Sequence, residues 1–167
     1  AGAYTYGGAA GLQTLAPTSA GCQSAWNSVC RIGINYTQHI HPLWYVDRAA
    51  NSCTNCHNTR DAMAQVQVPA GQLDLTDGDS NDQPLHKNAY RELLFSDNKQ
   101  EVTMGALQDT IVTTVDPVTG EVTTNTINVS PSLAAGNARG SRFFSRFAPG
   151  GTHAGRLTPA ELRLVSE

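Results

Sequence analysis

Apolar residues recur with the spacing of short helices in three separate parts of this chain. Residues 34–46 supply an apolar face that predicts a short helix, disturbed where Pro42 removes a backbone donor. Residues 49–64 predict a second helical piece, and residues 86–95 predict a third whose apolar side chains share one side. This pattern favours a mostly α architecture.

Two local signals add a β-hairpin and a final helix. Between residues 110 and 129, two runs of Thr, Val and Ile flank the turn-forming residues 116–120, which predicts a hairpin inserted into a helical domain. Near the C-terminus, Thr158 is followed by Pro and, three residues on, by Glu161. This arrangement is a capping box and predicts the start of a last helix.

The remaining segments lack periodicity. Residues 1–33 are rich in Gly, Ala, Ser and Thr, which predicts an irregular N-terminal arm, and residues 69–84 combine Asp, Gly and Pro as surface loops do. We therefore expect an irregular arm over residues 1–33 and a helical domain over residues 34–167. The expected fold class is mostly α, with an inserted β-hairpin.

Length and charge exclude several classes of protein. The chain has 167 residues and a net charge of −3, and its 11 Lys and Arg residues are scattered, which argues against nucleic-acid binding. No run approaches the roughly 20 apolar residues that span a bilayer, so no membrane insertion is expected. The small residues that follow Ala1 are typical of a mature form left by signal-peptide removal, which predicts a periplasmic or secreted protein of bacteria.

Four cysteines form two pairs with different spacing. Cys22 and Cys30 lie close together in a polar stretch, and an oxidising compartment would join them in a disulfide. Two free buried thiols are the alternative, because spacing alone does not prove a bridge.

The second pair belongs to the pentapeptide Cys53-Thr54-Asn55-Cys56-His57. Two thiols at positions i and i+3 of a helical turn can both add to the vinyl groups on one porphyrin edge, and a His directly after the second thiol reaches the iron. A zinc site would need two more soft ligands, and a thioredoxin-like dithiol would follow a strand in a βαβ unit. The spacing therefore predicts one covalent haem c, bound by Cys53 and Cys56, with His57 as an iron ligand.

Several segments together resemble a known family. They are similar to the cytochrome domain of hydrazine synthase alpha subunit relatives, and they comprise residues 34–44, 53–57, 69–75, 141–144 and 157–162. The resemblance covers most of residues 34–167. It implies a mostly helical c-type cytochrome domain whose sixth iron ligand comes from a loop before the last helix.

The loop of residues 149–156 contains His153 and no Met, so His153 is the predicted sixth metal ligand. Its glycines allow the chain to turn inward, and a neutral imidazole binds both ferric and ferrous iron. His86 and Met104 remain alternatives. Met63 follows His57 so closely that it would stay on the proximal side of the haem.

The expected function is that of a monohaem electron carrier with bis-His ligation, acting with redox partner proteins. No separate catalytic constellation is evident. The alternative is a haem enzyme, or a fragment of a larger multihaem enzyme, with an open sixth iron position. An oligomer or a larger redox assembly is also compatible with the sequence.

The acidic stretch 77–82 lacks the Gly and Glu of an EF-hand, so a solvated turn is favoured over a calcium site.

Overall fold

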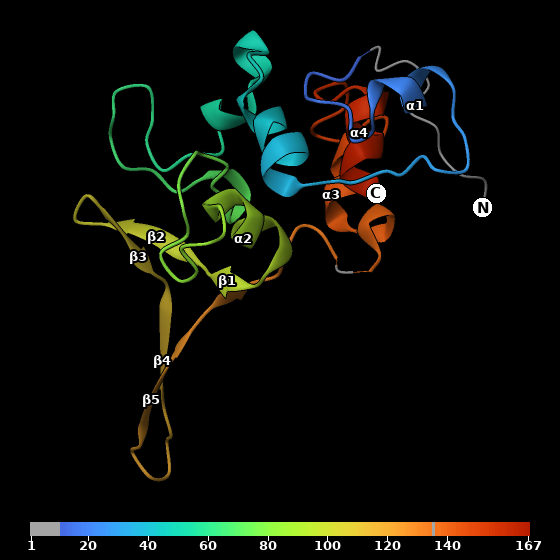
Figure 1. Ribbon diagram of the computed structural model, residues 1–167. Helices are drawn as coiled ribbons and strands as arrows, with labels where there is room; N and C mark the ends of the chain where they lie inside the picture. The colour runs from blue at the N-terminus through green and yellow to red at the C-terminus, as the bar shows by residue number, and fades with distance from the viewer. Residues whose placement is uncertain (1–10, 135) are drawn as a thin grey trace. The chain divides into compact units, whose positions relative to one another are not determined.

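The structure is a computed structural model that describes residues 11–134 and 136–167. The chain forms two compact units, which Figure 1 shows coloured along the sequence. The first unit combines residues 11–52 with Leu133–Glu167, so two segments far apart in the sequence contribute to it. The second unit is Cys53–Ser132, and it contains the cysteine motif.

The first unit consists of short helical segments. In chain order they are α1 (Ala20–Ser24), the π-helix Tyr36–Ile40, the 3₁₀ helices His41–Tyr45, Ala49–Asn51 and Ala138–Gly140, and the helices α3 (Arg142–Phe147) and α4 (Pro159–Ser166). Leu43 and Trp44 are buried in it, and the rings of Trp44 and Phe143 pack edge to face with their centroids 6.2 Å apart. Burial of each large apolar side chain contributes about 1.5–3 kcal/mol.

A buried ion pair joins the two halves of the first unit. Arg48 donates to Glu161 over 2.7 Å, and the Glu161 side chain is fully buried. Glu161 also accepts the backbone N–H of Thr158, while Thr158 accepts the N–H of Glu161. The predicted capping box at the start of α4 is therefore confirmed, and its acid has a second, long-range partner.

A disulfide between Cys22 and Cys30 closes the loop that follows α1, as predicted. The alternative of two free thiols is therefore wrong.

The second unit contains one α-helix and three small antiparallel sheets of two strands. The helix is α2 (Asn88–Leu94), and the short 3₁₀ helices are Cys53–Asn55 and Ala70–Gln72. The strands are β1 (Asp97–Asn98) paired with β6 (Asn128–Val129), β2 (Gln100–Thr103) with β3 (Ala106–Asp109), and β4 (Ile111–Val115) with β5 (Val122–Thr126). The core of this unit is small and comprises Cys53, Leu73, Leu75, Ala89 and Leu93.

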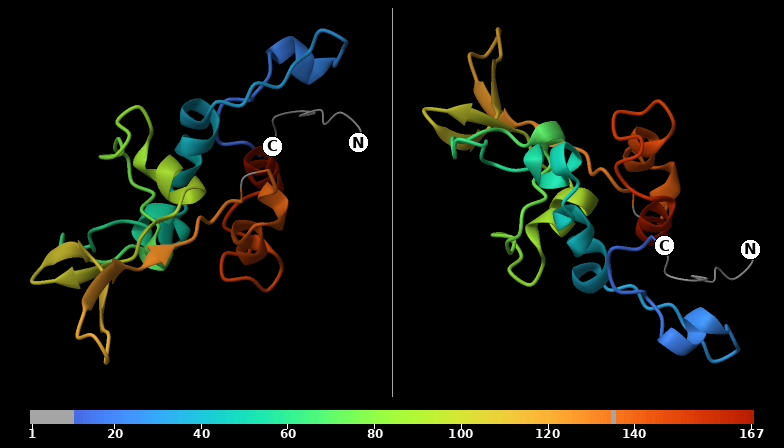
Figure 2. Two further views of the ribbon diagram at one scale, coloured as in Figure 1. Left: turned by 90° about the horizontal axis from the view of Figure 1, so that it is seen from below. Right: turned by 90° about the horizontal axis from the view of Figure 1, so that it is seen from above.

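The predicted hairpin is confirmed. Strands β4 and β5 pair from Ile111↔Thr126 to Val115↔Val122, and the Asp116 side chain accepts the backbone N–H groups of Val118 and Thr119 in the turn. Figure 2 shows this ribbon extending away from α2. Every residue in both strands is exposed, so local pairing and the turn hold the hairpin rather than a core.

The expectation of a mostly α fold is wrong. Of the described residues, 31% are helical and 17% are in strands, and the four α-helices have only five to eight residues each. The helix predicted over residues 49–64 is reduced to two 3₁₀ turns, Ala49–Asn51 and Cys53–Asn55. The physical reason is local competition, because side chains that follow the cysteines take up backbone donors that a helix would use.

Two such side chains lie directly after the motif. Asn58 accepts the backbone N–H of Arg60, and Asp61 accepts those of Met63 and Gln65. The chain therefore turns instead of continuing as a helix. Further on, α2 confirms the helix predicted within residues 86–95.

Candidate haem-binding site

The pentapeptide 53–57 forms a single helical turn. Cys56 and His57 both donate their backbone N–H to the carbonyl of Cys53, over 3.3 and 3.0 Å. Cys53 is buried and Cys56 is exposed, and neither belongs to a disulfide. The turn therefore holds two thiols three residues apart, followed at once by an imidazole, as thioether attachment to one porphyrin edge requires.

A hydrogen bond to the backbone orients His57. Its ring Nδ1 lies 3.1 Å from the carbonyl oxygen of Leu73. Because a carbonyl can only accept, Nδ1 carries the proton and Nε2 is the nitrogen that would bind iron. Iron-binding imidazoles in proteins are commonly held in this manner, which fixes the tautomer and raises the basicity of the ligand.

The segment of residues 70–75 packs along the cysteine turn through two more bonds. Ala70 donates to the carbonyl of Cys56 over 2.9 Å, and Leu75 donates to that of His57 over 3.0 Å. Leu73 and Leu75 are both buried, so the expectation that residues 69–84 form a surface loop is wrong for this part. Sequence reasoning did not find Leu73 as the partner of His57. The available signal was the alternation of Leu73, Asp74 and Leu75, because side chains of an extended segment alternate between two sides.

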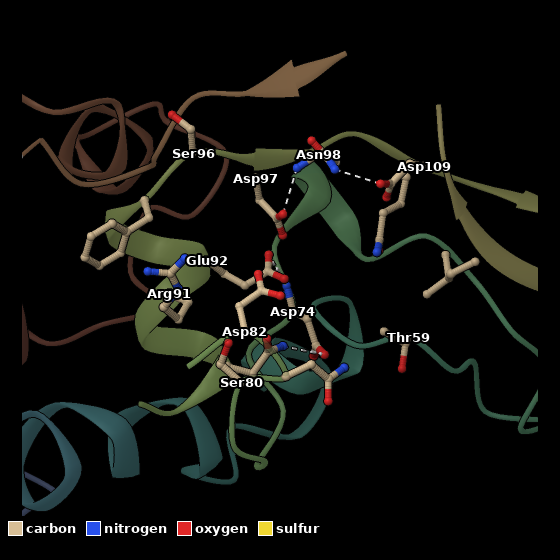
Figure 3. Close-up of a pocket in the computed structure, with 15 residues that line it drawn as sticks. Thr59, Asp74, Ser80, Asp82, Arg91, Glu92, Ser96, Asp97, Asn98 and Asp109 are labelled. Atoms are coloured by element: carbon tan, nitrogen blue, oxygen red, sulfur yellow. Dashed lines mark hydrogen bonds between the residues drawn. The ribbon is translucent and has the colours of Figure 1, made fainter. Parts of the chain in front are cut away.

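Next to this segment lies an acidic cavity of about 350 Å³. Figure 3 shows Asp74, Asp82, Glu92 and Asp97 gathered around it. The Asp74 backbone N–H donates to Glu92 Oε2 over 3.2 Å. The Asp74 carboxylate accepts the backbone N–H and the hydroxyl of Thr76, together with the side-chain amide of Asn88.

Glu92 titrates at an unusual pH for a carboxyl group. Burial is the main cause that raises its pKa to about 7, the hydrogen bond from the Asp74 backbone opposes this shift, and the nearby negative charges of Asp97 and Asp74 add to it. The sequence analysis did not single out Glu92. Its place on the amphipathic helix α2 gave no sign that it would face a second acidic segment.

The predicted sixth ligand, His153, lies in the first unit. Its Nδ1 is 2.8 Å from the Thr152 hydroxyl, and its ring packs against Phe147 with centroids 5.4 Å apart. Cys53, Cys56 and His57 lie together in the second unit, whereas His153 belongs to the first.

The alternatives to His153 belong to the second unit. The His86 ring contacts Tyr90 at 5.1 Å between centroids, and within the described part of the chain its buried Nδ1 has no hydrogen-bond partner. Met104 is fully exposed in the tight turn between β2 and β3. The described residues contain no group of three or more His, Cys, Asp or Glu side chains suited to a metal ion.

A lysine side chain pairs with two carboxylates of the acidic stretch 77–82. Lys87 Nζ lies 3.1 Å from a carboxylate oxygen of Asp77 and 3.1 Å from one of Asp79. Two of the oxygen donors that a calcium ion would need are therefore paired with an ammonium group.

Comparison with protein-family models, with curated proteins and with solved structures gave no match. Across residues 11–134 and 136–167, none of the helices has the length and apolar character needed to cross a bilayer.

Proposed function

We propose that this chain is a monohaem c-type cytochrome that carries electrons in the periplasm or outside the cell. The observation that carries the proposal is the hydrogen bond from His57 Nδ1 to the Leu73 carbonyl, next to the two thiols of the same turn. A dithiol redox motif has no need of an oriented imidazole. A structural zinc site would need a fourth protein ligand beside these three side chains.

The two cysteines and the histidine of the turn have separate roles. Cys53 and Cys56 would form the two thioether bonds, and His57 would bind the iron through Nε2. When bound, the haem supplies a one-electron couple, whose potential depends on the iron ligands and their surroundings. The Leu73 carbonyl holds the imidazole in the required tautomer, and the buried side chains of Leu73 and Leu75 keep that carbonyl in place.

The disulfide agrees with this location. Structural disulfides persist in oxidising compartments, where haem c is also assembled, and Cys22–Cys30 is such a bond. The second thiol of the haem motif, Cys56, is exposed and so is accessible for attachment.

Covalent attachment is the direct test. The protein, produced in a host that attaches haem c, is denatured, separated by electrophoresis and stained for haem, and its intact mass is measured. We expect one haem on the wild-type chain and none on Cys53→Ala/Cys56→Ala. The matched control Cys22→Ser/Cys30→Ser also removes two cysteines but should keep its haem. A wild-type chain that loses its haem on denaturation would refute the proposal.

His153 remains the proposed sixth ligand, with His86 and Met104 as the alternatives. His153→Ala should convert low-spin ferric haem to a high-spin form that binds cyanide readily, and CO after reduction, while His86→Ala should leave the spectrum unchanged. The reverse result would assign the position to His86. A high-spin spectrum in the wild-type protein would instead favour a haem enzyme with an open sixth position.

A further inference from the structure

The peptide group between Leu73 and Asp74 uses both of its polar atoms at the site. Its carbonyl oxygen lies 3.1 Å from His57 Nδ1, and its N–H donates to Glu92 Oε2 over 3.2 Å. The C=O and N–H of a trans peptide lie in one plane and point in opposite directions. The imidazole, the peptide and the carboxylate therefore form one connected chain of hydrogen bonds.

Hydrogen bonds in such a chain polarise one another. An ionised carboxylate at the N–H end draws the N–H dipole towards it and leaves more negative charge on the carbonyl oxygen. A more negative carbonyl accepts the His57 proton more strongly, which makes the imidazole a better electron donor to iron. Ferric iron, with the higher charge, gains more from this donation than ferrous iron.

Glu92 is held in position by the packing of its own helix. Its neighbours Ala89 and Leu93 on α2 are fully buried, which fixes that face of the helix against the unit's core. The charged groups that line the same cavity come from several segments, and they are Asp74, Asp82, Arg91, Asp97 and Asp109. Arg91 lies over the Phe95 ring at 4.4 Å, and among the described residues no cation pairs with Glu92.

We propose that Glu92 is a positioning residue for the iron ligand, acting through the Leu73–Asp74 peptide on His57 and so setting the reduction potential of the haem. This inference rests on the proposed function. It assigns a role to a side chain that lies outside the haem motif.

The charge of Glu92 gives the proposal a measurable signature. Because burial raises its pKa to about 7, the carboxyl changes charge near neutral pH rather than near pH 4.5. The ionised form favours ferric iron, so the midpoint potential should fall as pH rises through this range. The expected effect is that the proton affinity of Glu92 differs about tenfold between the ferric and ferrous forms, which corresponds to about 59 mV for one electron.

The test compares three haem-bearing proteins by spectroelectrochemical titration from about pH 5 to about pH 9, a range that spans the shifted carboxyl pKa. In the wild type, the potential should fall with one inflection. Glu92→Gln keeps an oxygen that can accept the Asp74 N–H but cannot ionise, so its potential should stay near the wild-type value at low pH. Asp82→Asn removes one acidic group from the same cavity without touching the peptide, and it should keep the wild-type pH profile.

A second measurement reports on His57 itself. The ¹⁵N resonance of His57 Nδ1 in the reduced protein should shift with pH through the same inflection in the wild type and stay constant in Glu92→Gln. A haem-bearing Glu92→Gln protein with the wild-type pH profile would overturn this inference and leave the proposed function intact. A wild-type chain without covalent haem would overturn both, and the haem stain distinguishes the two failures.

Discussion

The β4–β5 hairpin and the segment of residues 70–75 lie in the same unit and are stabilised in different ways. The hairpin has a regular ladder of paired residues, and all of its strand residues are exposed. Residues 70–75 have no repeating structure beyond one 3₁₀ turn, yet they bury Leu73 and Leu75 and bond to Cys56 and His57. Regular secondary structure is thus a poor guide to the site in this unit, because burial and long-range hydrogen bonds stabilise the irregular segment.

The largest effect on stability is expected when a buried side chain of residues 70–75 is truncated. Leu75→Ala should lower the free energy of unfolding by about 2–4 kcal/mol, because it removes a buried side chain and leaves a cavity. Urea denaturation followed by far-UV circular dichroism measures this change. Leu85→Ala is the matched control, since Leu85 is 99% exposed, and it should change stability by less than about 0.5 kcal/mol. Equal effects of the two substitutions would contradict the comparison.

A smaller loss is expected when the polar side of the same segment is changed. Asp74→Asn replaces one carboxylate oxygen with an NH₂ group, which donates and does not accept. The bonds from Thr76 and Asn88 therefore cannot all be kept. Each buried group left without its partner costs about 1–3 kcal/mol. The same denaturation experiment measures the loss, with the exposed Asp82→Asn as the control. If Asp74→Asn is as stable as the control, these hydrogen bonds do not hold the segment.

The pH dependence of stability sharpens the comparison further. The pKa of Glu92 in the folded protein, about 7, lies above its ordinary value of 4.5, so folding binds a proton between these two values. The stability from this group is present below about pH 4.5 and is lost as pH rises through about 7. At pH 8, Glu92→Gln should therefore be more stable than wild type by about 1–3 kcal/mol.

Denaturation curves at about pH 5 and about pH 8 test this expectation, since the two values lie on either side of the Glu92 transition. The gain from Glu92→Gln should be small at the lower pH and large at the higher one. A gain that is the same at both pH values would mean that Glu92 is not protonated on folding.

The smallest effect is expected in the hairpin. Val115→Thr replaces an exposed β-branched residue, paired with Val122, by another residue that favours strands. Its free energy of unfolding should differ from that of wild type by less than about 0.5 kcal/mol in the same urea experiment. A loss as large as that of Leu75→Ala would contradict the comparison, because it would mean that these exposed strands stabilise the unit as strongly as its buried core does.

Features determined by neighbouring residues were predictable. The Asp116 turn, the capping box of Thr158 and Glu161, and helix α2 all depend on interactions within a few positions of the chain, and the structure confirms each of them. The Cys22–Cys30 disulfide belongs to this group, because its cysteines lie only eight positions apart. The order of the thiols and imidazole in residues 53–57 is likewise a property of the sequence.

One local feature was predicted wrongly: the helix expected over residues 49–64 is absent because the bonds of Asn58 and Asp61 turn the chain, and the fold is therefore not mostly α. Tertiary structure alone decided the contacts around the site. The partner of His57 is 16 residues away, and Glu92 reaches Asp74 across 18. A single sequence carries no periodic signal for such contacts, because they form only when separate segments bury their apolar side chains together. The predicted haem-binding residues all belong to one pentapeptide, whereas the environment of its histidine depends on how distant segments pack.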